Sequence, residues 1–294
     1  MDIKQLKYFI EVADTKNLSR AAENLYISQP TLSLAMKKIE KDLNIKLFGK
    51  KQKYSLTPAG QLLYDRGSEI VRNFDRLISE MDNFGRGKNE VLRLGVTILF
   101  AVQYMHQIST FIAKHQNVNL HIIQDGSINL QKMLAKGDID IAIASLPNLY
   151  PKDIKFTPLE NKYNGYNVSV VMLDSNPLAD KAEIELIELK DQKFSTLNED
   201  FMIGELLISR SRELGFKPDI VMEHVDLQVL LHSISELGSV CLLPIEYRGI
   251  TDSPNLKWVP LKDDRAFFQV GIAERLNIAR TEAANDLANN ILNA

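Results

Sequence analysis

Residue types that catalyse reactions or bind metals are scattered through this 294-residue sequence and form no recognisable set. The dinucleotide-binding, phosphate-loop and zinc-protease motifs are missing from it. Asp138 and Asp140 follow a glycine where a strand is predicted to begin, which favours a turn over a carboxylate pair for acid–base work. Cys241 lies in an apolar run and is interpreted as a packing residue. The five histidines, which lack the spacing of metal ligands, stand at positions 106, 115, 121, 224 and 232. We therefore expect no catalytic residues, no metal site and no cofactor.

The residues whose types and spacing do suggest chemistry are basic and lie near the N-terminus. Residues 28–53 hold seven lysines against Glu40 and Asp42. Residues 1–90 hold 16 Lys and Arg against 12 Asp and Glu, whereas residues 91–294 hold 19 against 26. A basic head on an acidic body indicates a polyanionic partner at one end of the chain, with solvated surface lysines as the alternative.

Three helices are predicted to position these basic residues. Apolar residues at helical spacing indicate a first helix of about twelve residues from near Leu6. Ser19 is a plausible N-cap for a short second helix through Leu25, and Ser28 for a third helix with Pro30 in its first turn. The apolar face of the third helix must pack inward and consists of Leu32, Ala35, Met36, Ile39 and Leu43.

The opposite face of the third helix is polar and basic, which is what a helix-turn-helix presents to DNA. Ser33 can meet a base edge or a phosphate, and Lys37 can reach guanine acceptors or phosphate. Leu34 either contacts a thymine methyl group or packs against a neighbouring element. After this helix, a Gly-Lys-Lys-Gln-Lys turn between two short apolar segments predicts a β-hairpin, or wing, and Thr57-Pro58 opens another helix. The predicted DNA-binding residues are Ser28, Gln29, Pro30, Thr31, Ser33, Leu34, Lys37, Lys50, Lys51 and Lys53.

Residues 21–60 resemble the DNA-binding head of the LysR-type transcriptional regulators. The elements that carry the resemblance are Ala21-Ala22, Ser28-Gln29-Pro30, Ser33, Ile39-Glu40, Leu43, Leu47-Phe48 and Thr57-Pro58-Ala59-Gly60. This family usually has Arg where Lys50 stands. The charge is kept there without a bidentate contact, so a phosphate would be held less rigidly.

A long helix is predicted from Pro58 to about Phe84, because no proline interrupts it and apolar residues recur at steps of four and three. This seam pairs with a second copy of the chain or packs against the C-terminal domain of the same chain. The resemblance implies the first, an antiparallel dimer of linker helices, and Gly67 would let two backbones approach closely. The predicted dimerisation residues are Leu63, Gly67, Ile70, Phe74, Leu77 and Met81.

Strand-like and helix-like stretches alternate from Val91 to the end of the chain in two sets, which predicts parallel α/β sheets in two lobes. The resemblance implies a periplasmic-binding-protein-like effector domain with chain crossovers near 160–166 and 262–268. The fold class is therefore α+β overall, with an N-terminal winged helix-turn-helix, a long linker helix and a two-lobed α/β domain. The expected boundaries are 1–58 for the head, 59–88 for the linker and hinge, and 89–294 for the effector domain. Lobe 1 is expected at about 91–162 with 267–294, and lobe 2 at about 163–266.

Ligands of such sheets bind beyond the carboxyl ends of the strands, near helix N-termini. In many relatives the loop after the first strand of the sensor domain offers hydroxyls to a ligand carboxylate, but here Thr97 is its only hydroxyl and no Lys or Arg lies in these loops. We therefore predict a small effector of mixed polarity, or a weak acid with much apolar surface. Leu99 and Phe100 either contact it or pack inside the lobe. The predicted effector-binding residues are Thr97, Leu99, Phe100, Ser127, Ser195, Thr196 and Asn198.

These observations predict a ligand-responsive, LysR-type transcription regulator that is not an enzyme. Its expected partners are double-stranded promoter DNA, a small-molecule effector, a second copy of itself in a dimer or tetramer, and RNA polymerase. The single cysteine and the lack of a long apolar run predict a cytoplasmic protein without a membrane span. Two other readings stay open. One is a small-molecule binding module that acts by protein contact and carries a vestigial DNA head; the other is an α/β enzyme with an accessory head.

Overall fold

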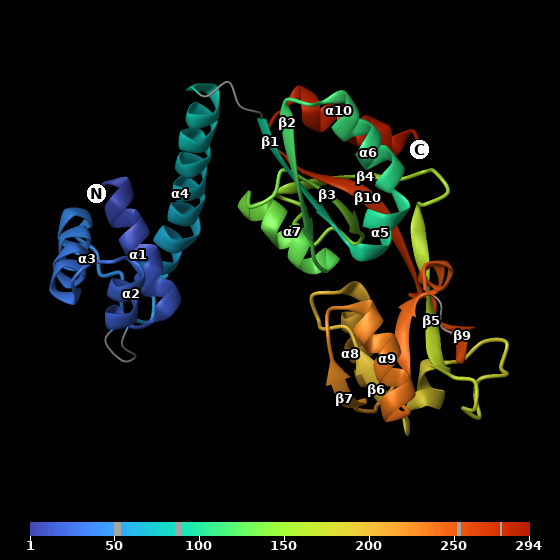
Figure 1. Ribbon diagram of the computed structural model, residues 1–294. Helices are drawn as coiled ribbons and strands as arrows, with labels where there is room; N and C mark the ends of the chain where they lie inside the picture. The colour runs from blue at the N-terminus through green and yellow to red at the C-terminus, as the bar shows by residue number, and fades with distance from the viewer. Residues whose placement is uncertain (50–53, 86–89, 252–253, 277) are drawn as a thin grey trace. The chain divides into compact units, whose positions relative to one another are not determined.

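A computed structural model describes residues 1–49, 54–85, 90–251, 254–276 and 278–294. Contacts within the chain divide it into two units, residues 1–88 and 89–294. The first unit is helical, and the second is built on mixed β-sheets covered by helices (Figure 1). The predicted α+β fold class is confirmed, and each unit has its own apolar core.

The head consists of three helices whose starts are capped by side chains. Asp2 and Gln5 form a reciprocal capping box at the first helix, and Ser28 caps the third as predicted. The second helix is capped by Asn17, whose side chain accepts hydrogen bonds from the backbone of Ser19 and Arg20, and not by Ser19 as the sequence suggested. The three helices are α1 (Ile3–Thr15), α2 (Leu18–Asn24) and α3 (Gln29–Leu43).

The wing and the linker helix follow α3. The predicted hairpin is represented by one antiparallel bridge between Phe48 and Leu56, and the expected lysine tip at 50–53 lies outside the described residues. The Thr57 hydroxyl accepts a hydrogen bond from the Gly60 backbone and donates to the Lys46 carbonyl at 2.7 Å, so it caps the next helix and ties it to the wing. That helix is α4 (Pro58–Gly85), continuous as predicted.

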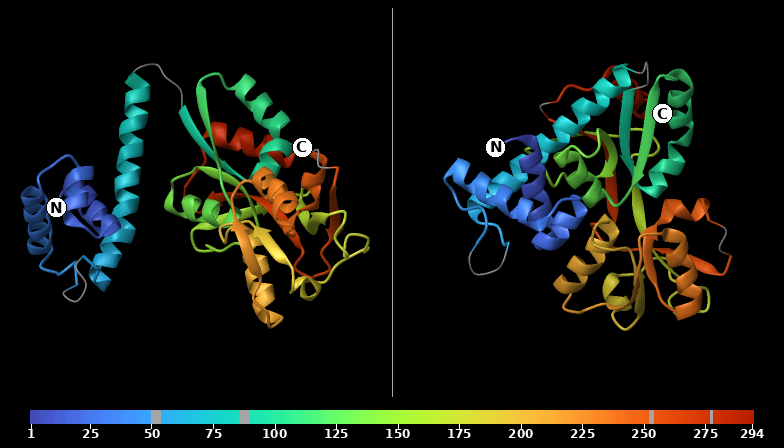
Figure 2. Two further views of the ribbon diagram at one scale, coloured as in Figure 1. Left: turned by 60° about the horizontal axis from the view of Figure 1, so that its bottom comes forward. Right: turned by 60° about the vertical axis from the view of Figure 1, so that its left-hand side comes forward.

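Lobe 1 of the second unit is a five-stranded sheet with helices on both faces (Figures 1 and 2). The strand order is β2-β1-β3-β10-β4, where the first three strands run parallel and β10 runs antiparallel to both neighbours. Two helices follow the first strand and meet at the buried Tyr104. The elements are β1 (Glu90–Val96), α5 (Ile98–Gln103), α6 (Met105–Lys114), β2 (Val118–Gln124), α7 (Ser127–Lys136), β3 (Ile141–Ser145), β4 (Ile154–Pro158), β10 (Phe267–Arg275) and α10 (Glu282–Leu292).

Lobe 2 is built around β5, which pairs antiparallel with both β8 and β9. A second, parallel pair of strands, β6 and β7, joins this group through a bridge between Phe194 and Val240. The elements are β5 (Gly165–Leu173), β6 (Lys193–Thr196), α8 (Met202–Glu213), β7 (Asp219–Glu223), α9 (Leu227–Leu237), β8 (Cys241–Pro244) and β9 (Leu256–Pro260), with 3-10 turns at Leu186–Leu189 and Ile245–Gly249.

Two strands carry the chain between the lobes. The start of β5 pairs with the start of β10, Gly165 with Gln269 and Asn167 with Phe267. Beyond this short ladder β5 continues into lobe 2 and β10 into lobe 1, as Figure 1 shows. Since the crossing strands run antiparallel to their neighbours, both sheets are mixed, whereas the sequence pattern had suggested parallel sheets.

Candidate DNA-binding face and ligand crevice

Helix α3 separates apolar from polar side chains as the sequence predicted. Leu32 and Ile39 are fully buried and Met36 nearly so, against α1 and α2. On the other side Gln29, Pro30 and Lys37 are exposed, and Leu34 is 67% exposed. The packing alternative for Leu34 therefore finds no support within the head, and an apolar side chain is left free to meet a DNA methyl group.

The first turn of α3 presents hydroxyls that already bond to each other. The Ser28 and Thr31 hydroxyl oxygens lie 2.7 Å apart, and Ser28 also accepts from the Thr31 backbone. One turn on, Ser33 and Lys37 line an open groove of about 440 Å³ between α3 and the wing. Of the predicted DNA-binding residues, all those on α3 and its cap share this exposed side. Lys50, Lys51 and Lys53 lie outside the described residues.

Glu40 joins the third helix to the wing. Its carboxylate accepts hydrogen bonds from the Leu47 backbone at 2.9 Å and the Phe48 backbone at 3.4 Å, and pairs with Lys46 at 2.6 Å. Burial opposes ionisation, but the hydrogen bonds from Lys46 and the two backbone groups outweigh it and lower the pKa of Glu40. Glu40 belongs to the Ile39-Glu40 element of the family resemblance, and in the structure its carboxylate holds the base of the wing.

Glu40→Ala is expected to destabilise the wing by about 1–3 kcal/mol, because two backbone donors lose their acceptor. The amides of Leu47 and Phe48 should then exchange with deuterium faster, as mass spectrometry of the full chain can measure. Because the folded pKa is lowered, this contribution holds at neutral pH and is lost as acid protonates the folded carboxylate. Glu40→Gln is the control: it keeps an acceptor and gives up an ion pair to an exposed lysine, so exchange should change little. If the amides of Leu47 and Phe48 exchanged equally fast in the alanine variant and the wild type, Glu40 would not hold the base of the wing.

Tyr26 is a candidate contact that the sequence reading missed. It occupies the turn between α2 and α3, has a positive φ of 54°, and is 96% exposed. An aromatic side chain in the left-handed region that packs on nothing is unusual, and its hydroxyl is suited to a phosphate. The sequence showed only a turn here, because neither exposure nor φ can be read from one residue.

The linker helix packs its first half against α1 of the head. A Cβ at Gly67 would lie 2.6 Å from Leu6 Cδ1, so this glycine admits α1 and not a second linker helix. Leu63 also packs on the head core. The Tyr64 hydroxyl donates to Asp14, and this bond, with burial, raises the pKa of Tyr64 to about 12. The predicted seam must therefore be corrected at Leu63 and Gly67, which serve the head itself.

The second half of α4 exposes the rest of the predicted seam. The side chains at these positions are 39–59% exposed in this chain: Ile70, Phe74, Leu77, Ile78 and Met81. Five large apolar side chains along one helix form an uncovered apolar face, called here the linker face, within the described part of the first unit.

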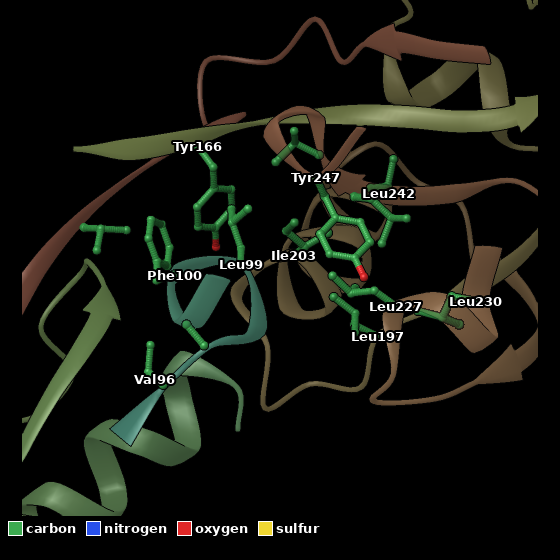
Figure 3. Packing of buried hydrophobic residues seen from close by; sticks show 14 of the residues in the cluster. Val96, Leu99, Phe100, Tyr166, Leu197, Ile203, Leu227, Leu230, Leu242 and Tyr247 are labelled. Carbon is green, nitrogen blue, oxygen red and sulfur yellow. The ribbon is translucent and has the colours of Figure 1, made fainter. Parts of the chain in front are cut away.

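The effector domain has a small cavity between its lobes, with a volume of about 30 Å³. Predicted residues Thr97, Leu99 and Ser127 line it from the start of α5 and the start of α7. Figure 3 shows Leu99 and Tyr166 on one side of this region, opposite Ile203 and Leu227. The lining that the sequence reading missed consists of Ile98, Tyr166, Leu197, Phe201, Met202, Ile203, Leu227 and Pro244. Several of these precede or begin predicted helices, which is the signal that could have located them.

The four other predicted effector residues do not line the cavity. Phe100 is fully buried and packs on Tyr104 and Tyr166, so the packing alternative is correct for it. Ser195 is buried and bonds to the Ser239 hydroxyl at 2.7 Å, and the buried Thr196 hydroxyl donates to the Leu197 carbonyl. Asn198 lies in the loop after β6 and binds Asp200. Because the last three side chains of β6 are all buried, Ser195 and Thr196 belong to the core of lobe 2.

Buried hydroxyls connect the cavity wall to the strand that crosses between the lobes. Ser127 donates to Ser145 Oγ at 3.2 Å and accepts from its backbone at 2.9 Å, and Ser145 donates to the Tyr166 hydroxyl at 3.2 Å. Tyr166 is 6% exposed and packs on Phe268 of β10. Burial raises the pKa of Tyr166, so this hydroxyl stays protonated at neutral pH.

A direct backbone contact closes the lobes over the cavity. The Ile128 N–H, in the first turn of α7, donates to the Asp200 carbonyl of lobe 2 at 3.0 Å. A Cβ at Gly126 would lie 2.2 Å from that oxygen, so only glycine lets the two backbones meet here. We call this contact the clasp.

Metal-binding clusters and membrane-spanning helices are not found in the described residues. Among the described residues, no group of three or more acidic, histidine or cysteine side chains is placed to hold a metal ion. Cys241 is buried, and burial raises the pKa of its thiol, as expected of a packing residue. No helix in the described ranges has both the length and the apolar content needed to cross a membrane.

Comparisons with known proteins identify the family of each unit. Residues 3–61 match the family model of bacterial regulatory helix-turn-helix proteins of the lysR family, and residues 85–294 match the LysR substrate binding domain. The chain is 31% identical over 265 residues to YwbI, an uncharacterized HTH-type transcriptional regulator of Bacillus subtilis (strain 168), covering 90% of this chain and 86% of YwbI. It is 26% identical over 289 residues to GltC, a transcriptional dual regulator of the same strain, covering 97% and 95%.

Solved structures share the fold. CbnR, a LysR family transcriptional regulator, has a TM-score of 0.65 at 18% identity, covering 99% of this chain and 98% of CbnR. Full-length CbnR in complex with its target DNA has a TM-score of 0.63 at 18% identity, covering 99% of each chain. The two family models together span both units, and the relatives align over nearly the whole length. The chain therefore belongs to the LysR family of transcriptional regulators, with a helix-turn-helix DNA-binding domain and an effector-binding domain.

Proposed function

We propose that this LysR-family regulator binds promoter DNA as a dimer through α3, the turn before it and the wing, and that a small molecule held between the lobes changes this binding. The observation that carries the proposal is the exposed polar and basic side of α3, held by a well-packed apolar back. In the proposed complex with DNA, Gln29 and Ser33 contact base edges, and Lys37 and the wing lysines contact phosphates.

The assembly proposed is a dimer made through the linker face, which leaves two copies of α3 to bind two half-sites. Pairing of dimers into tetramers, contact with RNA polymerase and action in the cytoplasm complete the proposal and rest on family membership. The rival reading, a ligand-binding module with a vestigial head, is less favoured because the head keeps its caps, its core and an exposed α3.

The proposal is tested by measuring how salt affects binding of the full chain to its own promoter fragment and to random DNA. Lys37→Ala is expected to weaken binding to both and to reduce the salt slope by about 1, because one phosphate contact is lost. Ser33→Ala is expected to lower discrimination between the two DNAs by about 1–3 kcal/mol if a base contact is lost. Lys38→Ala is the control, since Lys38 lies about 100° further round the helix and has the same charge. No preference of the wild type for the promoter fragment would favour the protein-contact reading instead.

A further inference from the structure

The cavity between the lobes is almost entirely apolar. Of its eleven lining residues, three carry a polar side chain: Thr97, Ser127 and Tyr166. The Ser127 hydroxyl already donates one hydrogen bond to Ser145 and accepts another from it. The Tyr166 hydroxyl only accepts from Ser145, so its own O–H can donate to a ligand. Thr97 Oγ1 makes no hydrogen bond within the described part of the chain. A ligand here meets apolar carbon and two hydroxyls, and no Lys, Arg or His lines the cavity.

Four carboxylates adjoin this apolar lining in the sequence. Asp125 stands two residues before Ser127, Asp200 one residue before Phe201, Asp226 one residue before Leu227, and Glu246 two residues after Pro244. Their hydrogen-bond donors are neutral: Asp125 accepts from Gly126 and Asn129, Asp200 from Asn198, Asp226 from Gln228, and Glu246 from Asn167. In the described residues none of the four forms an ion pair with Lys or Arg. Four carboxylates without a cationic partner in the described residues therefore stand within two residues of the lining.

The charges of two of these carboxylates help to raise the pKa values of two tyrosines. Burial raises the pKa of Tyr166, a hydrogen bond from Ser145 lowers it, and the charge of Glu246 raises it further. Burial and the charge of Asp226 likewise raise the pKa of Tyr247, against a hydrogen bond from Gln228. Tyr166 lines the cavity, so an anion placed beside its hydroxyl would meet the same burial and the same carboxylate charge. A carboxylate entering the cavity would lose its hydration shell, find no cation, and be repelled.

We propose that the cavity takes a compact, mainly apolar molecule that carries a hydroxyl, carbonyl or amine and no carboxylate. The Tyr166 O–H donates to a hydroxyl or carbonyl oxygen of the ligand, whereas an ammonium group donates to the hydroxyl oxygen of Tyr166 or Thr97. The nearby carboxylates favour an ammonium group over an anion. This inference rests on the proposed function, in which the crevice is the effector site. It narrows the earlier expectation, which left a weak acid open.

The size of the cavity adds a condition. About 30 Å³ is the room of roughly one water molecule, whereas benzene needs about 150 Å³. A ligand with five carbon atoms is larger than this cavity. It therefore enters when the clasp between Ile128 and Asp200 breaks and the lobes separate, and the lobes then close around it.

Three probes with one carbon skeleton separate charge from shape: 3-methylbutan-1-ol, 3-methylbutan-1-amine and 3-methylbutanoate. Thermal unfolding of the full chain is measured with each at equal concentrations. The alcohol and the amine are expected to raise the Tm. The acid is expected to require a concentration at least about tenfold higher to give the same shift in Tm. Equal or greater stabilisation by the acid would overturn the proposal. So would stabilisation by none of the three, because an apolar cavity must accept the alcohol.

Two variants assign the effect to this cavity. Asp125→Asn with Asp226→Asn keeps both side-chain acceptors, and Asn caps a helix as well as Asp, so the fold is preserved. It should reduce the shift given by the amine and leave that given by the alcohol. Tyr166→Phe should reduce both. An unchanged amine shift in the first variant, or an unchanged alcohol shift in the second, would place the binding elsewhere and contradict the proposal.

The same preparations distinguish this inference from the function on which it depends. Binding of the promoter fragment is measured without any probe. If the alcohol binds as described but the promoter is not preferred, the cavity assignment stands and the regulatory function fails. If the promoter is preferred and the acid is the best probe, the function stands and the ligand class is wrong.

Discussion

Ile70→Asp combined with Leu77→Asp will convert the regulator into a monomer whose affinity for a promoter with two half-sites is lower by at least about a hundredfold. Both side chains are more than half exposed in this chain and belong to the linker face. In a dimer each would be buried, and two carboxylates per copy would then lose water without a partner, at several kcal/mol each. Binding also loses the coupling between two heads, which is why the effect on DNA exceeds that on any single contact.

Light scattering of the full chain gives the mass, and a gel-shift titration gives the affinity. Gln61→Asp with Asn73→Asp is the matched control, since it adds the same two charges at exposed polar positions of α4. The control should remain dimeric. A double Ile70, Leu77 variant that still has the dimer mass would show that the linker face is not the interface.

Gly126→Val is expected to hold the lobes apart. The added side chain would overlap the Asp200 carbonyl and the Phe201 backbone, which are backbone atoms and cannot turn aside. The Ile128–Asp200 hydrogen bond is then lost, so the amides of residues 126–130 and 198–202 should exchange about tenfold faster or more in the full chain. Glu199→Ala, an exposed change in the same loop, is the control. Unaltered exchange in the valine variant would mean that the clasp does not hold the lobes closed.

The head was largely predictable because its signals are local. The Ser28 cap, the apolar back of α3 and the uninterrupted α4 each depend on residues within a few turns of one another. The apolar stripe of α4 was predictable for the same reason, because periodicity finds such a stripe but not what covers it. At its first part, Leu63 packs on the head core and Gly67 meets Leu6 of α1, which lies about sixty residues earlier in the chain.

The strands β4 and β9 were missed for a different reason. Ile154–Pro158 and Leu256–Pro260 are short, mix charged with apolar residues and end in proline, so neither shows a clear alternation. They become strands because the crossing strands β10 and β5 offer them an edge. That edge exists only once distant parts of the chain have come together.

The sequence predicted some of the residues that line the cavity and assigned others to it that do not line it. Thr97 and Ser127 follow strand ends, as the rule for α/β sheets predicts, and both line the cavity. Ser195 and Thr196 also stand at a strand end, but both side chains are buried and belong to the core of lobe 2. Tyr166 lies in the crossover, where the sequence offers no periodicity from which the direction of its side chain can be predicted.

The strand crossing has a consequence for synthesis of the protein. Strand β10 of lobe 1 comes from late in the chain and fills the place between β3 and β4, whereas lobe 2 is continuous between the two crossings. A ribosome therefore releases the head, the linker and all of lobe 2 before the sheet of lobe 1 can close. The nascent chain can thus hold a folded DNA-binding head while its sensor is still incomplete, and a stop codon before residue 267 would produce a head with no working crevice.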